Sequence, residues 1–213
     1  MPSLATALYG LLKGSSSVEQ RTEVSKRGAL YTQMDLPPFA QLAAEGKIWT
    51  AGEATAVAAV VALPTTTAGI SLYNNEAEGG LSYVLIAAIA TQVANAAAQA
   101  SWHLAQCVGV LKPTTRPTAD IAAASIKSFG KSPSGAYGGN AIVDLGATVV
   151  DDLWKPIGPS VNTAVVSLSG TAVWVPLNGG VVIGPGGTYS LKGIASAVDI
   201  TLRIGFVWAE VQL

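Results

Sequence analysis

The closing segment, residues 200–213, carries the pattern that most restricts the fold. Large apolar side chains occupy every second position: Ile200, Leu202, Ile204, Phe206 and Trp208. Because successive side chains of a β-strand point to opposite faces, this period of two predicts a strand with one face firmly buried in a core. We expect the segment to lie within a sheet, so that truncating it by a few residues unfolds the protein.

From Trp49 onward, short runs of Val, Ile, Thr and aromatic residues alternate with turn signals made of Gly, Pro and Asn. The expected strands are 54–63, 68–73, 81–93, 100–111, 140–150, 161–168, 172–175, 180–183, 188–194 and 200–213. Short strands at near-regular spacing predict a mainly β fold, a sandwich or a barrel. The Pro-, Gly- and Ser-rich stretch 113–139 is expected to make a long excursion from one end of it.

One region can be read in two ways. Residues 86–106 are rich in Ala, which favours helix. The apolar positions can also be divided into two strands joined across 95–99, and we favour this reading. Strands with many Ala residues suit close approach between packed sheets or subunits.

The first fifty residues differ from the rest and are predicted to form an arm that precedes a β-sandwich domain, residues 51–213. Two short helices are expected, one near 4–12 behind Ser3 and one over 39–45 that ends at Gly46. A disordered tail is the alternative, but it would not need so many apolar side chains. The candidate docking residues of the arm are Leu4, Leu8, Leu11, Leu12, Tyr31, Phe39, Leu42 and Trp49.

Charged residues are scarce. They make up 12% of the chain, against 50% hydrophobic residues, whereas an average soluble domain is roughly 25% charged. Between Thr50 and Leu111 there is no Lys or Arg, and the acidic residues are Glu53, Glu76 and Glu78. A surface so poor in charge is hard to keep free of apolar patches, so we expect part of it to be buried against copies of the chain or against a partner.

The same composition argues against two classes of partner. Binding nucleic acid needs clustered Lys and Arg, and the chain has a net charge of −1 and no such cluster. Crossing a membrane as a helix takes roughly 20 apolar residues, and the apolar stretches 54–63 and 81–98 are too short or are interrupted by Gln92 and Asn95. We therefore expect no nucleic acid and no membrane partner, and a soluble protein made in a reducing compartment.

Residues able to do chemistry are few. The chain has one histidine, His103, and no G-x-S-x-G nucleophile motif beside it. One Cys and one His cannot build a structural zinc site, and Cys107 is expected to be a small buried hydrophobe. The run 74–79 begins like a calcium loop, but position 85 is Leu instead of the closing acid, so a polar turn is expected.

Phosphate, glycosidase and sugar-binding sites are also poorly supported. The segment Gly130-Lys131-Ser132 lacks the first glycine of a phosphate loop, because position 125 is Ser. The carboxylates Asp144, Asp151, Asp152, Asp199 and Glu210 are scattered in a charge-poor background. Trp154 lies in an expected loop and is the candidate exposed contact among the tryptophans. We expect no enzyme, no cofactor and no metal.

Three segments resemble small structural proteins of tailed bacteriophages: 70–84 (ISLYNNEAEGGLSYV), 182–191 (VIGPGGTYSL) and 205–208 (GFVW). In particular, the chain resembles jelly-roll decoration (cement) proteins. The resemblance covers residues 50–213 in general texture, and no single motif in it is diagnostic. It implies a jelly-roll-like antiparallel sandwich behind an extended N-terminal arm with short helices.

The resemblance also implies a function. A protein of this kind is made in the host cytoplasm, sits as a homotrimer on the capsid exterior of the virion, and uses its arm to clamp subunits of the major capsid protein or of other virion proteins. The alternative is an adhesive module, either the receptor-binding part of a tail fibre or a carbohydrate-binding domain. A tryptophan whose fluorescence responds to a glycan would favour the adhesive module.

Overall fold

The closing segment forms strand β13 (Thr201–Val211), which lies inside a sheet as its alternation predicts. The computed structural model describes residues 23–24, 30–31, 39–94, 99–110, 119–130, 136–148, 153–163, 171–197 and 199–213. The chain divides into two units, Met1–Ala40 and Gln41–Leu213. In the first unit, β1 (Glu23–Val24) pairs antiparallel with β2 (Leu30–Tyr31).

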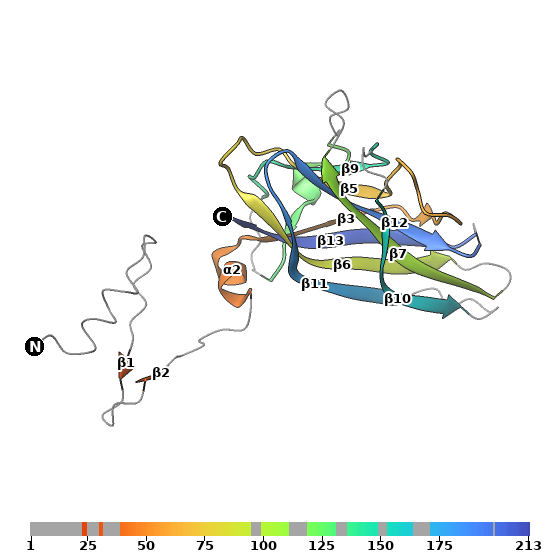
Figure 1. The fold of residues 1–213 in the computed structure, drawn as a ribbon, viewed down its shortest axis with the longest axis horizontal. Coiled ribbons are helices and arrows are strands. Elements are labelled where there is room, and N and C mark those ends of the chain that lie inside the picture. The colour runs from red at the N-terminus through yellow and green to blue at the C-terminus, as the bar shows by residue number, and fades with distance from the viewer. Residues whose placement is uncertain are drawn as a thin grey trace, which may run out of the picture. The chain divides into compact units, whose positions relative to one another are not determined.

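The second unit is a sandwich of two antiparallel sheets (Figure 1). Its six-stranded sheet has the order β11-β6-β13-β3-β8, with β4 paired to β13, and its five-stranded sheet has the order β10-β7-β12-β5-β9. The bounds in the first sheet are β3 Ile48–Gly52, β4 Val57–Ala58, β6 Ser82–Ala94, β8 Lys127–Ser128 and β11 Ala172–Ile183. Those in the second are β5 Ile70–Asn74, β7 Ala100–Val110, β9 Ala141–Leu145, β10 Lys155–Thr163 and β12 Gly187–Ala195.

The long strands pair in a nested order. β7 pairs with β10, β6 with β11, β5 with β12, and β3 with β13. The strands of the first half of the sandwich thus pair antiparallel with those of the second half. Successive pairs lie in the five-stranded and the six-stranded sheet in turn. This is the topology of a jelly roll, and it confirms the expected fold class.

The core lies between the two sheets. It contains the predicted alternating face of β13, since Ile200, Leu202, Ile204, Phe206 and Trp208 are all buried. Aromatic rings meet edge to face from Trp49 to Tyr137, from Tyr137 to Trp208, and from Trp208 through Phe206 to Tyr189. Such ring pairs add stabilisation beyond the area they bury.

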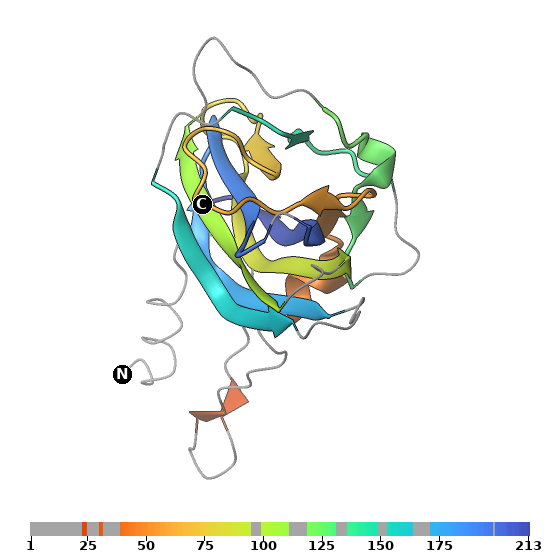
Figure 2. The same cartoon turned by 90° about the vertical axis from the view of Figure 1, so that its right-hand side faces the viewer.

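The two sheets also meet at one edge. Both views show β10 and β11 running alongside each other (Figures 1 and 2). Gly158 of β10 has φ +70°, and a Cβ added there would lie 2.5 Å from Cγ2 of Val175 in β11. Glycine is therefore required here for both its backbone conformation and its size.

Several expected strands are placed as predicted. Residues 86–106 are strand and not helix, because β6 and β7 cover them apart from 95–98, which lie outside the described residues, and Gln99. The helix expected over 39–45 is α2 (Ala40–Glu45), and Gly46 follows it with φ +73°. The helix expected near 4–12 lies outside the described residues.

Other boundaries were wrong. The strand expected over 54–63 is reduced to β4 and a single bridge from Val60 to Ile194, because this segment crosses from one sheet to the other. The strands expected at 172–175 and 180–183 are one strand, β11, whose pairing shifts between Pro176 and Val181. The strand expected at 161–168 begins earlier, at Lys155, and it tolerates Pro156 and Pro159 because β10 is an edge strand.

The predicted arm boundary at residue 50 also needs correction. Strand β3 begins at Ile48 and pairs with β13, so the last residues assigned to the arm belong to the sandwich. The excursion expected over 113–139 contains, in its described part, a short 3-10 helix η1 (Ala123–Ser125) and strand β8.

Candidate functional site: the outer face of the six-stranded sheet

Strand β11 turns a row of uncharged side chains toward solvent. Its residues at 172, 174, 176, 178, 180 and 182 are exposed, and those between them are buried or half-buried. Val173, Val175, Leu177, Val181 and Ile183 belong to or pack against the core. The exposed row therefore lies on the outer face of the six-stranded sheet.

The register extends this face across the neighbouring strands. In three rows that run from β11 through β6 and β13 to β3, no residue carries a charge: Trp174–Ile89–Gly205–Gly52, Pro176–Ala87–Val207–Thr50 and Val182–Val84–Ala209–Ile48. The next row, Ala172–Thr91–Arg203, introduces an exposed arginine. Within the three uncharged rows, Ala87, Val207, Ala209 and Ile48 are buried, so the solvent-exposed part lies mainly on β11. We call these three rows the β11 face.

An aromatic pair lies on the β11 face. The rings of Phe129 and Trp174 are stacked, with centroids 5.8 Å apart and an interplanar angle of 29°. Phe129 follows β8, at the opposite edge of the sheet from β11, and its N–H donates a hydrogen bond to the carbonyl oxygen of Ile48 at 2.8 Å. Phe129 and Trp174 are still 40% and 47% exposed.

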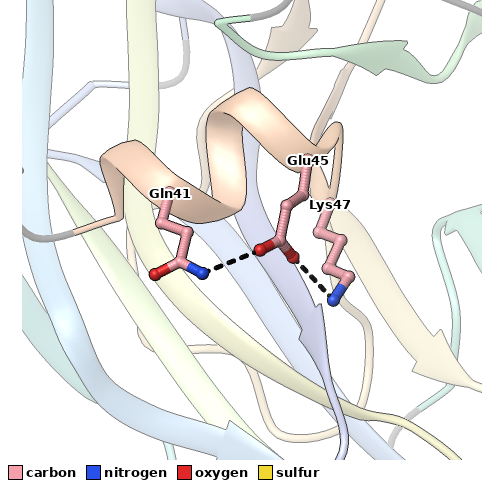
Figure 3. Close-up of polar contacts among 3 residues, drawn as sticks. All are labelled: Gln41, Glu45 and Lys47. Carbon is pink, nitrogen blue, oxygen red and sulfur yellow. Dashed lines mark hydrogen bonds and ion pairs between the residues drawn. The ribbon is translucent and has the colours of Figure 1, made fainter. Parts of the chain in front are cut away.

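The charge of Glu45, the last residue of helix α2, is neutralised by an ion pair. Glu45 accepts a hydrogen bond from Gln41 at 2.9 Å and pairs with Lys47 at 2.7 Å (Figure 3). The hydrogen bonds from Lys47 and Gln41 lower the pKa of Glu45 below its ordinary value. A pair so exposed contributes little to stability, but it leaves the helix without net charge. Ala43 contacts the Gly130 backbone next to Phe129, since a Cβ at Gly130 would lie 3.3 Å from that of Ala43.

The outer face of the five-stranded sheet is different. Trp154 is buried there at 5% exposure, in a cluster with Ala68, Ala105, Cys107 and Ile194. The expectation that Trp154 is an exposed contact is therefore wrong, because the segment before β10 packs this indole against β7 and β12. Cys107 is buried, as expected.

A buried carboxylate joins the two sheets near the C-terminal end of β13. Glu210 accepts hydrogen bonds from the Tyr137 hydroxyl at 2.6 Å and from Trp208 Nε1 at 3.1 Å. The N–H of Ala141 in β9 donates to the same hydroxyl at 2.7 Å. Burial raises the pKa of Glu210 above its ordinary value despite these donors. The contacts are those of a structural tie between β13 and β9.

A second buried carboxylate lies near a small open cavity of about 360 Å³, lined by Val60, Ala62, Pro64, Thr65, Thr67 and Lys192. Glu53 Oε2 accepts from the N–H of Ile204 at 3.0 Å, and its Oε1 is buried without a hydrogen bond. Burial raises the pKa of Glu53 and lowers that of Lys192. Both groups are thus shifted toward their neutral forms.

The predicted docking residues fall into three groups. Leu4, Leu8, Leu11 and Leu12 lie outside the described residues, and only the backbone of Tyr31 is described, in β2. Phe39 and Leu42 are half-buried, before and within α2. Trp49 is a strand residue that packs on the core, so it is not part of an arm.

Sequence reasoning missed Trp174 and Phe129. The alternation of Val173, Trp174 and Val175 was visible, but it does not say which of the two faces is buried. His103 lies on β7 between buried Trp102 and Leu104, on the opposite face. In the described part of the chain, no three His, Cys, Asp or Glu side chains gather as a metal site, and no helix is long and apolar enough to cross a membrane.

Comparison with known proteins adds little. No family model matches the chain, and no curated protein matches it. Among solved structures, it is similar to a chain of the full particle of Israeli acute paralysis virus heated to 63 degrees, at 11% identity and a TM-score of 0.23, covering 100% of this chain and 85% of that one. A TM-score this low carries no argument, so function has to be inferred from the residues of this chain.

Proposed function

We propose that this protein is a non-enzymatic structural protein of a virion, a capsid decoration protein that associates with copies of itself as a trimer and clamps major capsid subunits through its N-terminal arm, residues 1–47. The observation that carries the proposal is the β11 face. A monomer in water gains nothing from exposing Trp174 and Val182 on an uncharged strand. A protein that works as a subunit of a larger particle buries such a face.

The fold and the sequence support the same function. Two sheets in a jelly roll give a rigid body, which is what a protein that reinforces a shell requires. The buried Glu210 is occupied by two donors from its own chain, and it is therefore held in a structural role. The likeness of segments 70–84, 182–191 and 205–208 to decoration proteins points the same way.

The mass of the purified chain in solution tests self-association. Sedimentation equilibrium is expected to give a species of three times 21.6 kDa at micromolar concentration. A species of 21.6 kDa over the whole accessible concentration range would contradict the proposal.

Binding to capsids of its own virus tests the arm. Replacing Leu8 and Leu11 together by Asp is expected to abolish cosedimentation with those capsids, because each buried Leu contributes roughly 1.5–3 kcal/mol. Replacing Ser15 and Ser17 by Asp adds the same charge to the same segment without removing apolar area, and it should leave binding intact. Equal binding by both variants would remove the arm from the proposal.

An adhesive module remains the second candidate, because Trp174 is an exposed indole on a strand that also exposes the polar Asn178. Sugars stack on such rings. Titrating the protein with a panel of glycans while following tryptophan fluorescence tests this candidate. A change that is lost in Trp174→Phe but kept in Trp154→Phe would favour it over decoration.

A further inference from the structure

Residues 61–67 form a loop whose two ends are fixed to strand β12. Just before the loop, the N–H of Val60 donates to the carbonyl oxygen of Gly193 at 3.1 Å, and just after it the N–H of Gly69 donates to that of Leu191 at 2.8 Å. These two carbonyl groups belong to the residues on either side of Lys192 in β12. Because the loop is held at both ends, the space between it and Lys192 is formed before any ligand arrives, which lowers the cost of binding.

This space is the open cavity of about 360 Å³ described above, here called the Lys192 cavity. Its lining combines apolar and polar residues: Val60, Ala62, Pro64, Thr65, Thr67 and Lys192. Small-molecule sites are concave, have volumes of roughly 300–1,000 Å³, and place a few polar groups among apolar walls. The Lys192 cavity lies at the lower end of this range, so it suits a ligand of few atoms.

The polar side chains of the lining are hydrogen-bond donors. Two are hydroxyl groups, Thr65 and Thr67, and the third is the ammonium group of the half-buried Lys192. Among the residues that the structure describes, none of these three side chains has a hydrogen bond or an ion pair. Donors of which one is a cation favour a ligand that accepts hydrogen bonds and carries negative charge.

Glu53 is the nearby group of opposite charge, and it leaves the ammonium group open to a ligand. A Cβ added to Gly69 would lie 3.7 Å from Glu53 Oε1 and 3.4 Å from Cδ of Lys192, so the carboxyl group approaches the stem of the lysine. Glu53 is not part of the cavity lining, its Oε2 accepts from the N–H of Ile204, and burial raises its pKa toward the neutral form.

Burial also lowers the pKa of Lys192, because it disfavours the ammonium form. An anion in the cavity would offset this cost, since an opposite charge close to a buried group favours its ionised form. A cationic ligand would increase the same cost.

We propose that the Lys192 cavity is a binding site for a small organic anion, a carboxylate on a short aliphatic chain. The carboxylate pairs with Lys192, and the aliphatic chain lies against Val60, Ala62 and Pro64. An inorganic anion has no apolar part to place against these walls, and an uncharged ligand leaves the ammonium group without a counterion. This inference goes beyond the structural role proposed above and does not rest on it.

Titration of the full chain with sodium butyrate, followed by saturation-transfer NMR of the ligand, tests the proposal. Binding is expected to saturate in the millimolar range, as fits a ligand of few atoms. Butyramide, which has the same shape without the charge, is expected to bind at least about tenfold more weakly, because the hydrogen bond to a charged partner is lost. A butyrate signal that does not saturate, or equal affinities for butyrate and butyramide, would overturn the proposal.

Lys192→Met removes the charge and keeps an unbranched side chain. It is expected to weaken butyrate binding at least about tenfold. Lys155→Met is the matched control, because Lys155 is exposed on β10 and does not line the cavity, and it should bind butyrate like the parent. Parent-like binding by Lys192→Met, or an equal loss in both variants, contradicts the site.

A second pair of variants decides if Lys192→Met fails to fold. Ala62→Phe places a ring in the cavity from an exposed residue of its lining and is expected to abolish butyrate binding. Val61→Phe adds the same ring at the neighbouring residue, which is 58% exposed and outside the lining, and should leave binding intact. Binding that survives Ala62→Phe, or is lost equally in both, overturns the site. Far-UV circular dichroism checks that each variant folds.

Discussion

The outer faces of the two sheets differ in how fully the chain covers them. On the five-stranded sheet, the chain covers its own face: Trp154 lies buried over Ala105 and Cys107, and the buried hydroxyl groups of Ser71 and Ser190 pair with their oxygens 2.7 Å apart. On the six-stranded sheet, Trp174 remains half exposed among uncharged neighbours.

The two faces therefore contribute differently to the stability of the monomer. A face that is sealed by its own chain contributes to the stability of the monomer. A side chain that stays exposed, as Trp174 does on β11, contributes less to the stability of the monomer. The two tryptophans, identical in chemistry, should therefore affect different measurements.

The largest expected effect separates these two tryptophans. Trp154→Ala is expected to destabilise the fold by about 3 kcal/mol, the low end for a buried Trp, because the indole N–H is buried without a partner and its loss offsets part of the cost. Trp174→Ala is expected to cost about 1 kcal/mol in the dissociated chain, because it removes the ring stack with Phe129, while weakening association. Urea unfolding at low protein concentration measures both, and equal losses would break the comparison.

A smaller effect tests how the two sheets are tied together. Tyr137→Phe removes the hydroxyl that joins Glu210 of β13 to Ala141 of β9 and is expected to cost about 2 kcal/mol, as for a buried hydrogen bond to an acidic group. Tyr73→Phe, on a half-buried ring of β5, is the control and should cost under about 0.5 kcal/mol. If the two variants unfold at the same urea concentration, the hydrogen bonds between Glu210 and Tyr137 do not hold the two sheets together.

The polar character of the sealed face can be tested with its serine pair. Ser71→Ala leaves the Ser190 hydroxyl buried without its partner and is expected to cost about 1 kcal/mol. Because removing both hydroxyls leaves no orphan, the double variant with Ser190→Ala should recover most of that loss. A thermal denaturation cycle of the four proteins measures the coupling, and strictly additive losses would show that the pair contributes nothing.

The smallest effect is a dependence on pH. Burial raises the folded pKa of Glu53, so the folded state holds a proton that the unfolded chain has released. The stability from this group is present in full below its ordinary pKa of 4.5 and is lost as pH rises through the folded pKa.

Glu53→Gln should therefore flatten the fall of unfolding free energy as the pH rises from about 4 to about 8. Glu78→Gln, on an exposed side chain, should leave the parent's slope unchanged. A parent whose unfolding free energy is flat over this range would mean that Glu53 stays ionised in the fold.

Local pattern was enough for much of the fold. The alternation of β13 predicted a buried strand correctly, and the turn signals around it predicted a sandwich. Boundaries failed where pairing overrode local signals: Gly158 and Pro159 resemble a turn but lie within an edge strand, and Asn178 and Gly179 interrupt β11 without ending it.

The sequence by itself determined that this chain is a charge-poor β protein, because period, turn residues and composition are properties of neighbouring positions. Which sheet face is covered was decided only by the tertiary structure. Trp154 follows Leu153 and Trp174 follows Val173 in the sequence, and neither position shows whether the indole will be buried. One becomes buried because the segment before β10 crosses a sheet face, and the other stays open because no described segment covers it fully.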